Sequence, residues 1–460
     1  MARADPSDAP HRPPPRTGRD GSAPGGAREA ALARESNPLK RFWKLLGPGF
    51  ITGASDDDPS GIGTYAIAGA SLGYATLWTA LITFPLMAAT QFISAKIGLV
   101  SGQGLAAVLR QHYPRWLLYP VVLALALANT INAGADIGAI AAAINLLVPI
   151  PIEALIVPVA VSILVLLIWG SYRLIDRTFK WLCLALLAYV GSALLANPDW
   201  RQVLLNTLIP TIRLDVQFIE TLVAILGTTI SPYLWFWQAS QEVEEQQAVR
   251  KQAGLKRRGF WKRRGTSDTE LGYAAWDTCI GMFFSNLVMY FIILATAATL
   301  HQAGKTDISS AAEAAEALRP LAGDAAAVLL AVGLIGAGFL AVPVLVGSSA
   351  YAIAEAFGWQ EGLDESPSRA ARFYGVIAIA TVVGLEINYL GLNPINALFY
   401  TAVIYGFLAP PLLFVIMLIA NNPRVMGDRV NGRWTNVLGW ATTLVMMAAA
   451  VTLVATWVKG

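Results

Sequence analysis

The stretch Gly47–Ala70, GPGFITGASDDDPSGIGTYAIAGA, places three consecutive aspartates and a Pro-Ser-Gly sequence inside an apolar segment. A carboxylate at the centre of a membrane helix costs about 2.5–3.5 kcal/mol. Proline removes a backbone donor, and glycine weakens the helix further. Such a segment fits a membrane where its helix unwinds into a polar cavity. We therefore predict a transmembrane helix that is broken at Asp56–Asp58; a loop between two shorter helices is the alternative.

The composition of the whole chain also predicts a membrane protein. Its 460 residues are 55% hydrophobic and 14% charged, whereas soluble domains are about 25% charged. Apolar segments near the length of about 20 residues that crosses a bilayer recur along the chain. The predicted spans are 48–70, 75–100, 118–148, 154–171, 179–197, 217–240, 276–300, 325–357, 373–391, 394–421 and 436–457. The fold class is an all-α integral membrane protein of about eleven transmembrane helices.

Lysine and arginine predict the orientation of these spans. With the N-terminus inside, the loops after even-numbered spans carry 18 basic residues, and those after odd-numbered spans carry four. Because basic residues accumulate on the cytoplasmic side, we predict an inner-membrane protein with a cytoplasmic N-terminus. Eight of the 18 lie in the 250–264 stretch. We interpret it as a topology determinant and expect no nucleic-acid partner; a lipid- or nucleic-acid-binding patch is the alternative.

The N-terminal 36 residues differ from the rest of the chain. They are rich in Pro, Gly, Ala and Arg, and they show no hydrophobic period. A segment of this kind buries too little apolar surface to offset the entropy of ordering. We predict a disordered cytoplasmic tail over residues 1–36 and a transmembrane domain over residues 37–460.

A second break is predicted in span six, TLVAILGTTISPYLWFWQASQ at Thr221–Gln241. Gly227, Ser231 and Pro232 repeat the pattern of the first break. Spans one and six are corresponding positions in a five-plus-five inverted repeat, where paired broken helices indicate a transport site at the membrane midplane. The carbonyls freed at the breaks would form a cation site together with the aspartates. Clustered carboxylates need a positive partner, and the centre of neither span contains Lys or Arg to supply it.

At these residues the chain resembles the NRAMP family of divalent-metal transporters, over roughly residues 38–420. The resemblance rests on the two ends of the first span, on QFISAKIGLVSGQGLAAVLRQHYP at 91–114 and on AINLL at 143–147. It implies a leucine-transporter-like fold with broken helices one and six. It also implies a divalent metal ion as the transported substrate.

The chain departs from the family's motifs at several ligand positions. The family's first-helix motif is Asp-Pro-Gly-Asn; here Asp58 keeps the metal-binding Asp, while Gly61 replaces the Asn. In the sixth helix, Ser231 replaces the metal-binding Met and Tyr233 replaces the His, and the family's carbonyl ligand falls at Thr228. A thioether favours transition metals, so its loss predicts a divergent member that favours hard ions such as Mg²⁺ or Mn²⁺.

Aligned on AINLL, the third helix places Asp136 at the position of the family's Glu. We predict a proton-pathway role for Asp136; the alternative is a structural hydrogen bond in which Asn132 or Ser/Thr neighbours cap the Asp. Asn396 and Tyr400 are further polar residues, in span ten.

These inferences define the candidate site and function. The predicted metal- or substrate-binding residues are Asp56, Asp57, Asp58, Ser60, Thr228, Ser231 and Tyr233, and the predicted helix-breaking residues are Pro59, Gly61, Gly227 and Pro232. We predict a secondary, proton-linked transporter of a divalent cation that needs no cofactor, with the oligomeric state left open. The alternatives are the same fold carrying a non-metal solute such as an amino acid, or a non-transporting sensor. Enzyme motifs such as GxSxG, HExxH and Walker sequences are absent.

Overall fold

The computed structural model describes residues 47–169, 184–252, 266–308, 310–363, 365–391 and 393–459. Within these ranges all regular secondary structure is helical, as the all-α prediction requires. The predicted tail at 1–36 and the basic 253–264 stretch lie outside the described residues.

The first predicted break is present. Helix α3 (Pro48–Asp56) ends at the acids, and α4 (Pro59–Leu72) begins directly after them. Asp57 has φ −82° and ψ 52°, and Asp58 has φ −69° and ψ 168°, so both residues leave the helical region. Proline suits the first position of α4 because that position needs no backbone donor. Asp58 caps α4, since its side chain accepts the Gly61 amide.

The second break lies in span six. Helix α12 (Val216–Thr229) ends before Ile230, whose φ of −113° and ψ of 62° are not helical. Helix α13 (Pro232–Gln252) begins at the proline. Both interrupted spans therefore consist of two helices whose second half starts at a proline, as predicted from the sequence.

The remaining predicted spans each have one main helix. These helices are α5 (Trp78–Ser101), α7 (Arg115–Leu147), α8 (Ile152–Ile168), α10 (Ala188–Leu195), α14 (Asp268–Thr296), α17 (Ala326–Phe357), α18 (Ala371–Ile387), α19 (Pro394–Ala420) and α21 (Arg433–Lys459). In span five, predicted over 179–197, α10 follows the short 3-10 helix η2 (Leu184–Leu187), and residues 179–183 lie outside the described part of the chain. In the described part of the chain, eight helices are long and apolar enough to cross a membrane, the α12–α13 pair counting as one. The α3–α4 pair and the shorter apolar helices at 152–168 and 185–195 account for the other predicted spans.

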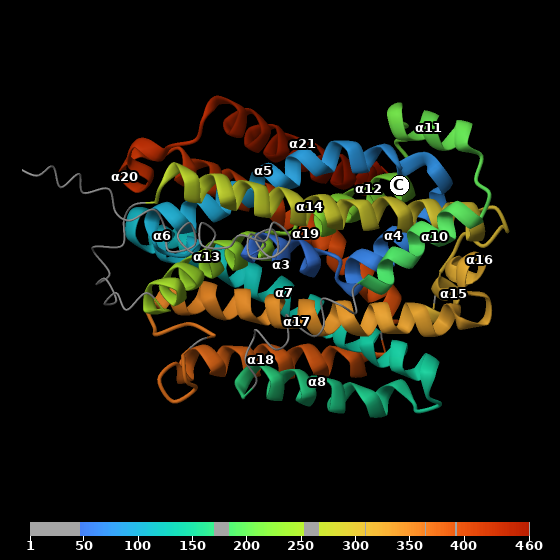
Figure 1. The fold of residues 1–460 in the computed structure, drawn as a ribbon, viewed down its shortest axis with the longest axis horizontal. Coiled ribbons are helices and arrows are strands. Elements are labelled where there is room, and N and C mark those ends of the chain that lie inside the picture. Colours follow the sequence, from blue (N-terminus) through green and yellow to red (C-terminus); the bar gives the residue numbers. More distant parts are fainter. Residues whose placement is uncertain are drawn as a thin grey trace, which may run out of the picture.

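Short helices lie at the two ends of the bundle (Figure 1). At one end are α6 (Leu105–His112) and α20 (Pro423–Met426); at the other are α11 (Trp200–Leu208), α15 (Ala311–Ala315) and α16 (Arg319–Ala322). The α6 and α20 end carries loops that follow even-numbered spans, and the opposite end carries loops that follow odd-numbered ones. This alternation agrees with the predicted order of spans.

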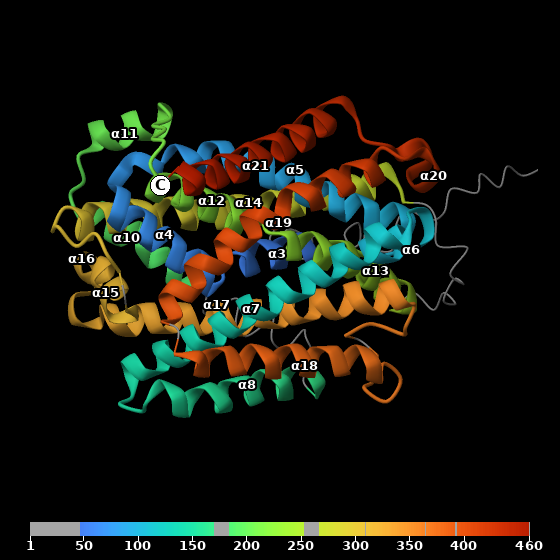
Figure 2. The ribbon, with the colours of Figure 1, turned by 180° about the vertical axis from the view of Figure 1, so that it is seen from behind.

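The broken helices lie inside the bundle. Helices α8 and α18 form an outer pair against α7 and α17, and α14 covers α3 (Figures 1 and 2). The α3 and α14 backbones approach closely, because a Cβ placed on Gly53 would lie 2.6 Å from Gly281 Cα. Small residues permit such contacts between membrane helices. The glycine pair therefore fixes the first half of broken helix one against α14.

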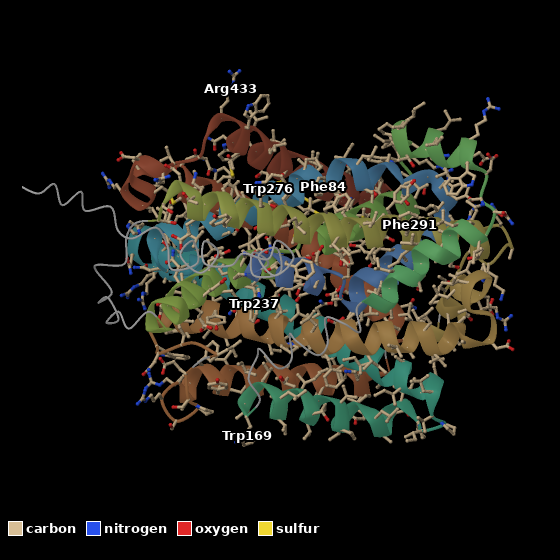
Figure 3. The ribbon with its side chains drawn as sticks, viewed as in Figure 1. Phe84, Trp169, Trp237, Trp276, Phe291 and Arg433 are labelled. Carbon is tan, nitrogen blue, oxygen red and sulfur yellow. The ribbon has the colours of Figure 1, made fainter. Side chains whose placement is uncertain are left out.

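The surface of the bundle is apolar, as contact with lipid requires. Trp169, at the end of α8, and Trp276 of α14 are both exposed, and Figure 3 shows Trp169 at the edge of the bundle. Trp237 of α13 is fully buried. Aromatic side chains on the outside suit a membrane and its interfaces.

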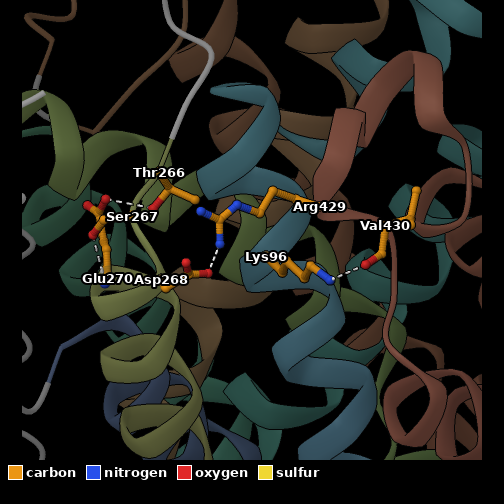
Figure 4. Close-up of polar contacts among 7 residues, drawn as sticks. All are labelled: Lys96, Thr266, Ser267, Asp268, Glu270, Arg429 and Val430. Carbon is orange, nitrogen blue, oxygen red and sulfur yellow. Dashed lines mark hydrogen bonds and ion pairs between the residues drawn. The ribbon is translucent and has the colours of Figure 1, made fainter. Parts of the chain in front are cut away.

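The connection between α20 and α21 is tied to two neighbouring helices (Figure 4). Arg429 forms an ion pair with Asp268 at the start of α14. Lys96 Nζ of α5 donates to the Val430 carbonyl at 3.0 Å. Ser267 caps α14 by accepting the Glu270 amide at 3.1 Å. These contacts hold the end of α19 and the start of α21 close to α5 and α14.

Candidate cation site

The two helix breaks meet at the residues that begin α4 and end α12. Ser60 Oγ and Thr228 Oγ1 are 3.4 Å apart, although they are separated by 168 positions in the chain. Both side chains are buried. Ser60 and Thr228, one predicted site residue from each broken span, therefore come together at this point.

Asp58 is the carboxylate at this junction. Its Oδ1 accepts the Ser60 hydroxyl at 2.6 Å and the Gly61 amide at 2.7 Å. Its Oδ2 accepts Asn132 Nδ2 at 3.0 Å and the Tyr233 hydroxyl at 3.5 Å. The side chain is 1% exposed, and these four donors are neutral. Neutral donors orient a buried carboxylate but leave its charge uncompensated.

Asp56 and Asp57 face a different helix. Ser285 Oγ of α14 donates to Asp56 Oδ2 at 2.6 Å and lies 3.2 Å from Asp57 Oδ1. The second Asp56 oxygen is buried without a hydrogen-bond partner. Among the described residues, no three His, Cys, Asp or Glu side chains are grouped so that they could hold a metal ion. The three consecutive aspartates are thus not brought together around one point.

The span-six residues differ in where their polar groups point. The Ser231 hydroxyl, at the break, is directed at backbone carbonyls of α12, Thr228 O at 2.5 Å and Gly227 O at 3.2 Å. The Thr228 carbonyl predicted as a free ligand is therefore engaged. Tyr233 instead reaches across to broken helix one, where its hydroxyl donates to Ser55 O at 3.2 Å.

Asp136 lies one helix away, on α7. It is fully buried, and neither carboxylate oxygen makes a hydrogen bond of normal geometry, although the Ser60 amide lies beside it. The alternative in which Asn132 or a Ser/Thr side chain caps Asp136 is wrong, because neither Asp136 oxygen has such a partner and Asn132 Nδ2 donates to Asp58. Asp136 is therefore a buried acid directed at the start of α4, without a structural partner from Asn132.

Two further helices contribute residues that the sequence analysis did not assign to the site. Thr401 of α19 donates to Asn132 Oδ1 at 2.7 Å, and the Tyr405 hydroxyl donates to Asn129 Oδ1 at 2.8 Å. Asn129, Asn132 and Asp136 are spaced by three and four residues, which places them on one face of a helix. Thr401 and Tyr405 are likewise four residues apart. This helical spacing of polar residues is the sequence feature that could have pointed to α7 and α19.

The polar residues of span ten that were noted from the sequence lie elsewhere. Asn396 and Tyr400 are both exposed, and Tyr400 has an exposed fraction of 61%. Thr401, the next residue, is 3% exposed and points toward Asn132. Moving one position along a helix rotates the side chain by about 100°. The position of a residue along span ten therefore did not show whether its side chain faces the site.

The site thus joins a buried carboxylate, hydroxyls and an amide at two helix breaks. A model of the Nramp family, described as natural resistance-associated macrophage protein-like, matches residues 49–456. The chain belongs to the Nramp family. The resemblance drawn from the first, second and third spans is therefore confirmed.

Two curated relatives illustrate what this Nramp protein is similar to. The chain is 26% identical over 415 residues to the divalent metal cation transporter MntH of Klebsiella pneumoniae, over 88% of this chain and 92% of the relative. It is 29% identical over 441 residues to MntH of Mycobacterium tuberculosis, over 95% of this chain and 97% of the relative. These relatives are transporters rather than enzymes.

Solved structures share the fold. The Eremococcus coleocola manganese transporter, crystallised with an aromatic bis-isothiourea compound, matches with a TM-score of 0.68 at 19% identity, over 92% of this chain and 88% of that chain. The closed form of Mhp1, a nucleobase-cation-symport-1 transporter, matches with a TM-score of 0.52 at 15% identity, over 89% and 93% of the two chains. These likenesses confirm the predicted leucine-transporter-like architecture.

Proposed function

We propose that this Nramp protein is a secondary transporter of a divalent cation, with Asp58 as the anchoring ligand. The position of Asp58 carries the proposal: a buried carboxylate, held by neutral donors, lies where both broken helices meet. A buried charge needs a counter-charge or a proton. The function named for the MntH relatives supports a divalent cation as that counter-charge.

The preferred ion is a hard one, such as Mg²⁺ or Mn²⁺. Hydroxyl and amide groups surround Asp58, from Ser60, Asn132 and Tyr233. Oxygen ligands suit Mg²⁺, Mn²⁺ and Ca²⁺, whereas sulfur favours softer metals. The Met289 sulfur contacts Thr229 Oγ1 at 3.4 Å rather than any of these groups. With one carboxylate in the immediate site, the ion keeps several waters, as Mg²⁺ usually does.

Proton linkage and orientation complete the proposal. Asp136, a buried acid beside the start of α4, is the proton-pathway residue. The protein lies in the inner membrane with its N-terminus in the cytoplasm, since the loops after even-numbered spans are rich in Arg and Lys. Asp56 and Asp57 contribute to the polar path near α14 through Ser285.

A flux assay on the purified chain in proteoliposomes tests the proposal. Mg²⁺, Mn²⁺, Ca²⁺ and Cd²⁺ are compared for the wild type, Asp58→Ala and a matched acid control, Asp428→Ala, whose side chain is exposed at the α20 end. We expect uptake of Mg²⁺ and Mn²⁺ by the wild type and the control, and none by Asp58→Ala. Normal transport by Asp58→Ala would show that the anchoring ligand lies elsewhere.

Two further measurements on the same protein, equilibrium ion binding and amino-acid flux, separate the alternatives. Binding of an ion at equilibrium without flux of any ion would favour a sensor. Flux of an amino acid without any divalent cation would favour a solute carrier and overturn the proposal. Three aspartates at the break in helix one argue against a carboxylate-bearing solute, because they would repel it.

A further inference from the structure

We propose that Asn132 is a ligand of the transported ion whose side-chain amide turns over when the ion binds. In the structure Nδ2 donates to Asp58; in the ion complex Oδ1 takes that place and coordinates the ion together with Asp58. This inference rests on the proposed function and deepens it, because it names a ligand on α7 that lies outside the two broken helices.

The first observation is the arrangement around the amide. Asn132 is fully buried. Its Nδ2 lies 3.0 Å from Asp58 Oδ2, and its Oδ1 accepts the Thr401 hydroxyl at 2.7 Å. The side chain therefore spans from the carboxylate of broken helix one to α19, with a donor at one end and an acceptor at the other.

The second observation is that Thr401 can serve either end of the amide. Its hydroxyl lies 2.7 Å from Asn132 Oδ1 and 2.7 Å from Leu398 O. A hydroxyl has one proton to donate and lone pairs to accept with. When the amide turns, Thr401 donates to Leu398 O and accepts from Asn132 Nδ2. Neither orientation leaves a buried polar group of Asn132 or Thr401 unsatisfied on this side, so the turn avoids the penalty of a lost hydrogen bond.

The Asp58 side decides which orientation is stable. After the turn, Asn132 Oδ1 faces Asp58 Oδ2 at the distance now held by Nδ2, 3.0 Å. Two acceptor oxygens repel each other at that distance unless a cation lies between them. Octahedral Mg²⁺ holds its ligands at about 2.0–2.1 Å, which separates adjacent oxygens by about 2.9 Å. The existing spacing of 3.0 Å is therefore close to one edge of a Mg²⁺ coordination octahedron.

Other side chains at the break are less able to supply this oxygen. Gly61 has no side chain, and its backbone amide donates to Asp58. The Ser231 hydroxyl is directed at backbone carbonyls of α12. Asn132 already contacts the anchoring carboxylate from a different helix, so ion binding there would draw α4, α7 and α19 together.

The test measures Mn²⁺ binding to the full chain in detergent by electron paramagnetic resonance, with Mg²⁺ as competitor. The variants are Asn132→Leu, which removes the oxygen, and Asn132→Asp, which keeps an oxygen at similar size. We expect about tenfold weaker binding for Asn132→Leu and binding at least as tight as wild type for Asn132→Asp. If Asn132 only donates to Asp58, its removal frees the carboxylate, so unchanged or tighter binding by Asn132→Leu would overturn the inference.

A spectroscopic measurement covers the case in which Asn132→Leu fails to fold. Wild-type chain labelled with ¹³C at asparagine Cγ is loaded with Mn²⁺ and examined by electron–nuclear double resonance. A coordinating amide oxygen places the labelled carbon about 3 Å from the metal, so we expect a ¹³C coupling that Asn132→Asp lacks. Its absence in the wild type overturns the inference. Asp58→Ala distinguishes a failure of the proposed function from a failure of this inference. Ion binding retained by Asp58→Ala contradicts the proposed function itself. Ion binding lost in Asp58→Ala but unchanged in Asn132→Leu contradicts the inference alone.

Discussion

Asp277 Oδ2 of α14 accepts the Gly49 backbone amide at 2.9 Å, across 228 positions of the chain. The other carboxylate oxygen accepts the Gly47 amide at 2.8 Å and the Phe50 amide at 3.1 Å. One buried acid therefore satisfies the first backbone donors of α3, which a helix cannot satisfy by itself. This cap, with the close contact of Gly53 and Gly281, anchors the first half of broken helix one on α14.

Asp277→Ala should destabilise the protein, because three backbone amides at the start of α3 lose their acceptor. Each unsatisfied buried donor costs about 1–3 kcal/mol, less where water enters. We expect a clear fall in the unfolding temperature in detergent, measured by intrinsic tryptophan fluorescence. Asp277→Asn keeps one acceptor oxygen, so we expect a smaller fall in its unfolding temperature. Equal stability of Asp277→Ala and wild type would show that α3 does not depend on this cap.

Asp136→Asn should flatten the pH dependence of uptake while leaving ion affinity within a few-fold of wild type. The carboxyl is buried beside the start of α4 but makes no hydrogen bond to Asp58 or Asn132. Its loss therefore removes a proton acceptor without removing a ligand. The measurement is initial uptake rate against external pH in proteoliposomes. Joint loss of binding and pH response would move Asp136 into the ion site, and unchanged transport would remove it from the mechanism.

The sequence predicted the breaks well because their causes are local. Prolines at 59 and 232 and the acids before Pro59 act within one helical turn, and the structure has α4 and α13 beginning at those prolines. The direction in which each aspartate points is not local. It depends on the non-helical backbone at Asp57 and Asp58 and on Ser285, which comes from a distant segment. The sequence therefore placed all three aspartates in one site, whereas in the structure Asp58 contacts Asn132 and the other two contact Ser285.

The contributions of α7 and α19 were missed for a related reason. Asn132 and Thr401 are single polar residues in long apolar helices, and their contact depends on how the helices are rotated. Polar spacing indicates which residues share a face, but it does not say which face points to the site. Only packing of the two helices against α4 settles that, and here it selects Thr401 over Tyr400.

Membrane orientation can be tested by labelling engineered cysteines in intact cells. In a background with Cys183 and Cys279 replaced by serine, Lys305→Cys and Leu255→Cys are treated with an impermeant maleimide. Lys305 follows the η4 helix (Ala297–His301), and its ammonium group pairs with Glu316, directly after α15. We expect labelling at position 305 and none at 255, because basic loops remain cytoplasmic. The reverse pattern would contradict the whole span assignment.

Ser231→Met should shift selectivity toward softer ions. Ser231 is 2% exposed and lies at the break between α12 and α13, one position after Ile230. A thioether there adds a contact that Cd²⁺ and Mn²⁺ value more than Mg²⁺ does. We expect a gain on the order of tenfold in affinity for Cd²⁺ over Mg²⁺, equivalent to about 1.4 kcal/mol. Gly61 limits the gain, because it supplies no side-chain oxygen.

The control for this substitution is Ser231→Leu, which adds similar bulk without sulfur. If crowding alone changed the site, Leu and Met would alter Cd²⁺ and Mg²⁺ binding alike. Both substitutions also remove the hydroxyl that lies against the Thr228 carbonyl at 2.5 Å. Part of any gain in ion affinity therefore comes from freeing that carbonyl oxygen. Because Met and Leu free it equally, the difference in affinity between the two variants measures the contribution of the sulfur. If Met and Leu match while Asp58→Ala still abolishes binding, the ion is held through its waters, too far from position 231 for direct coordination.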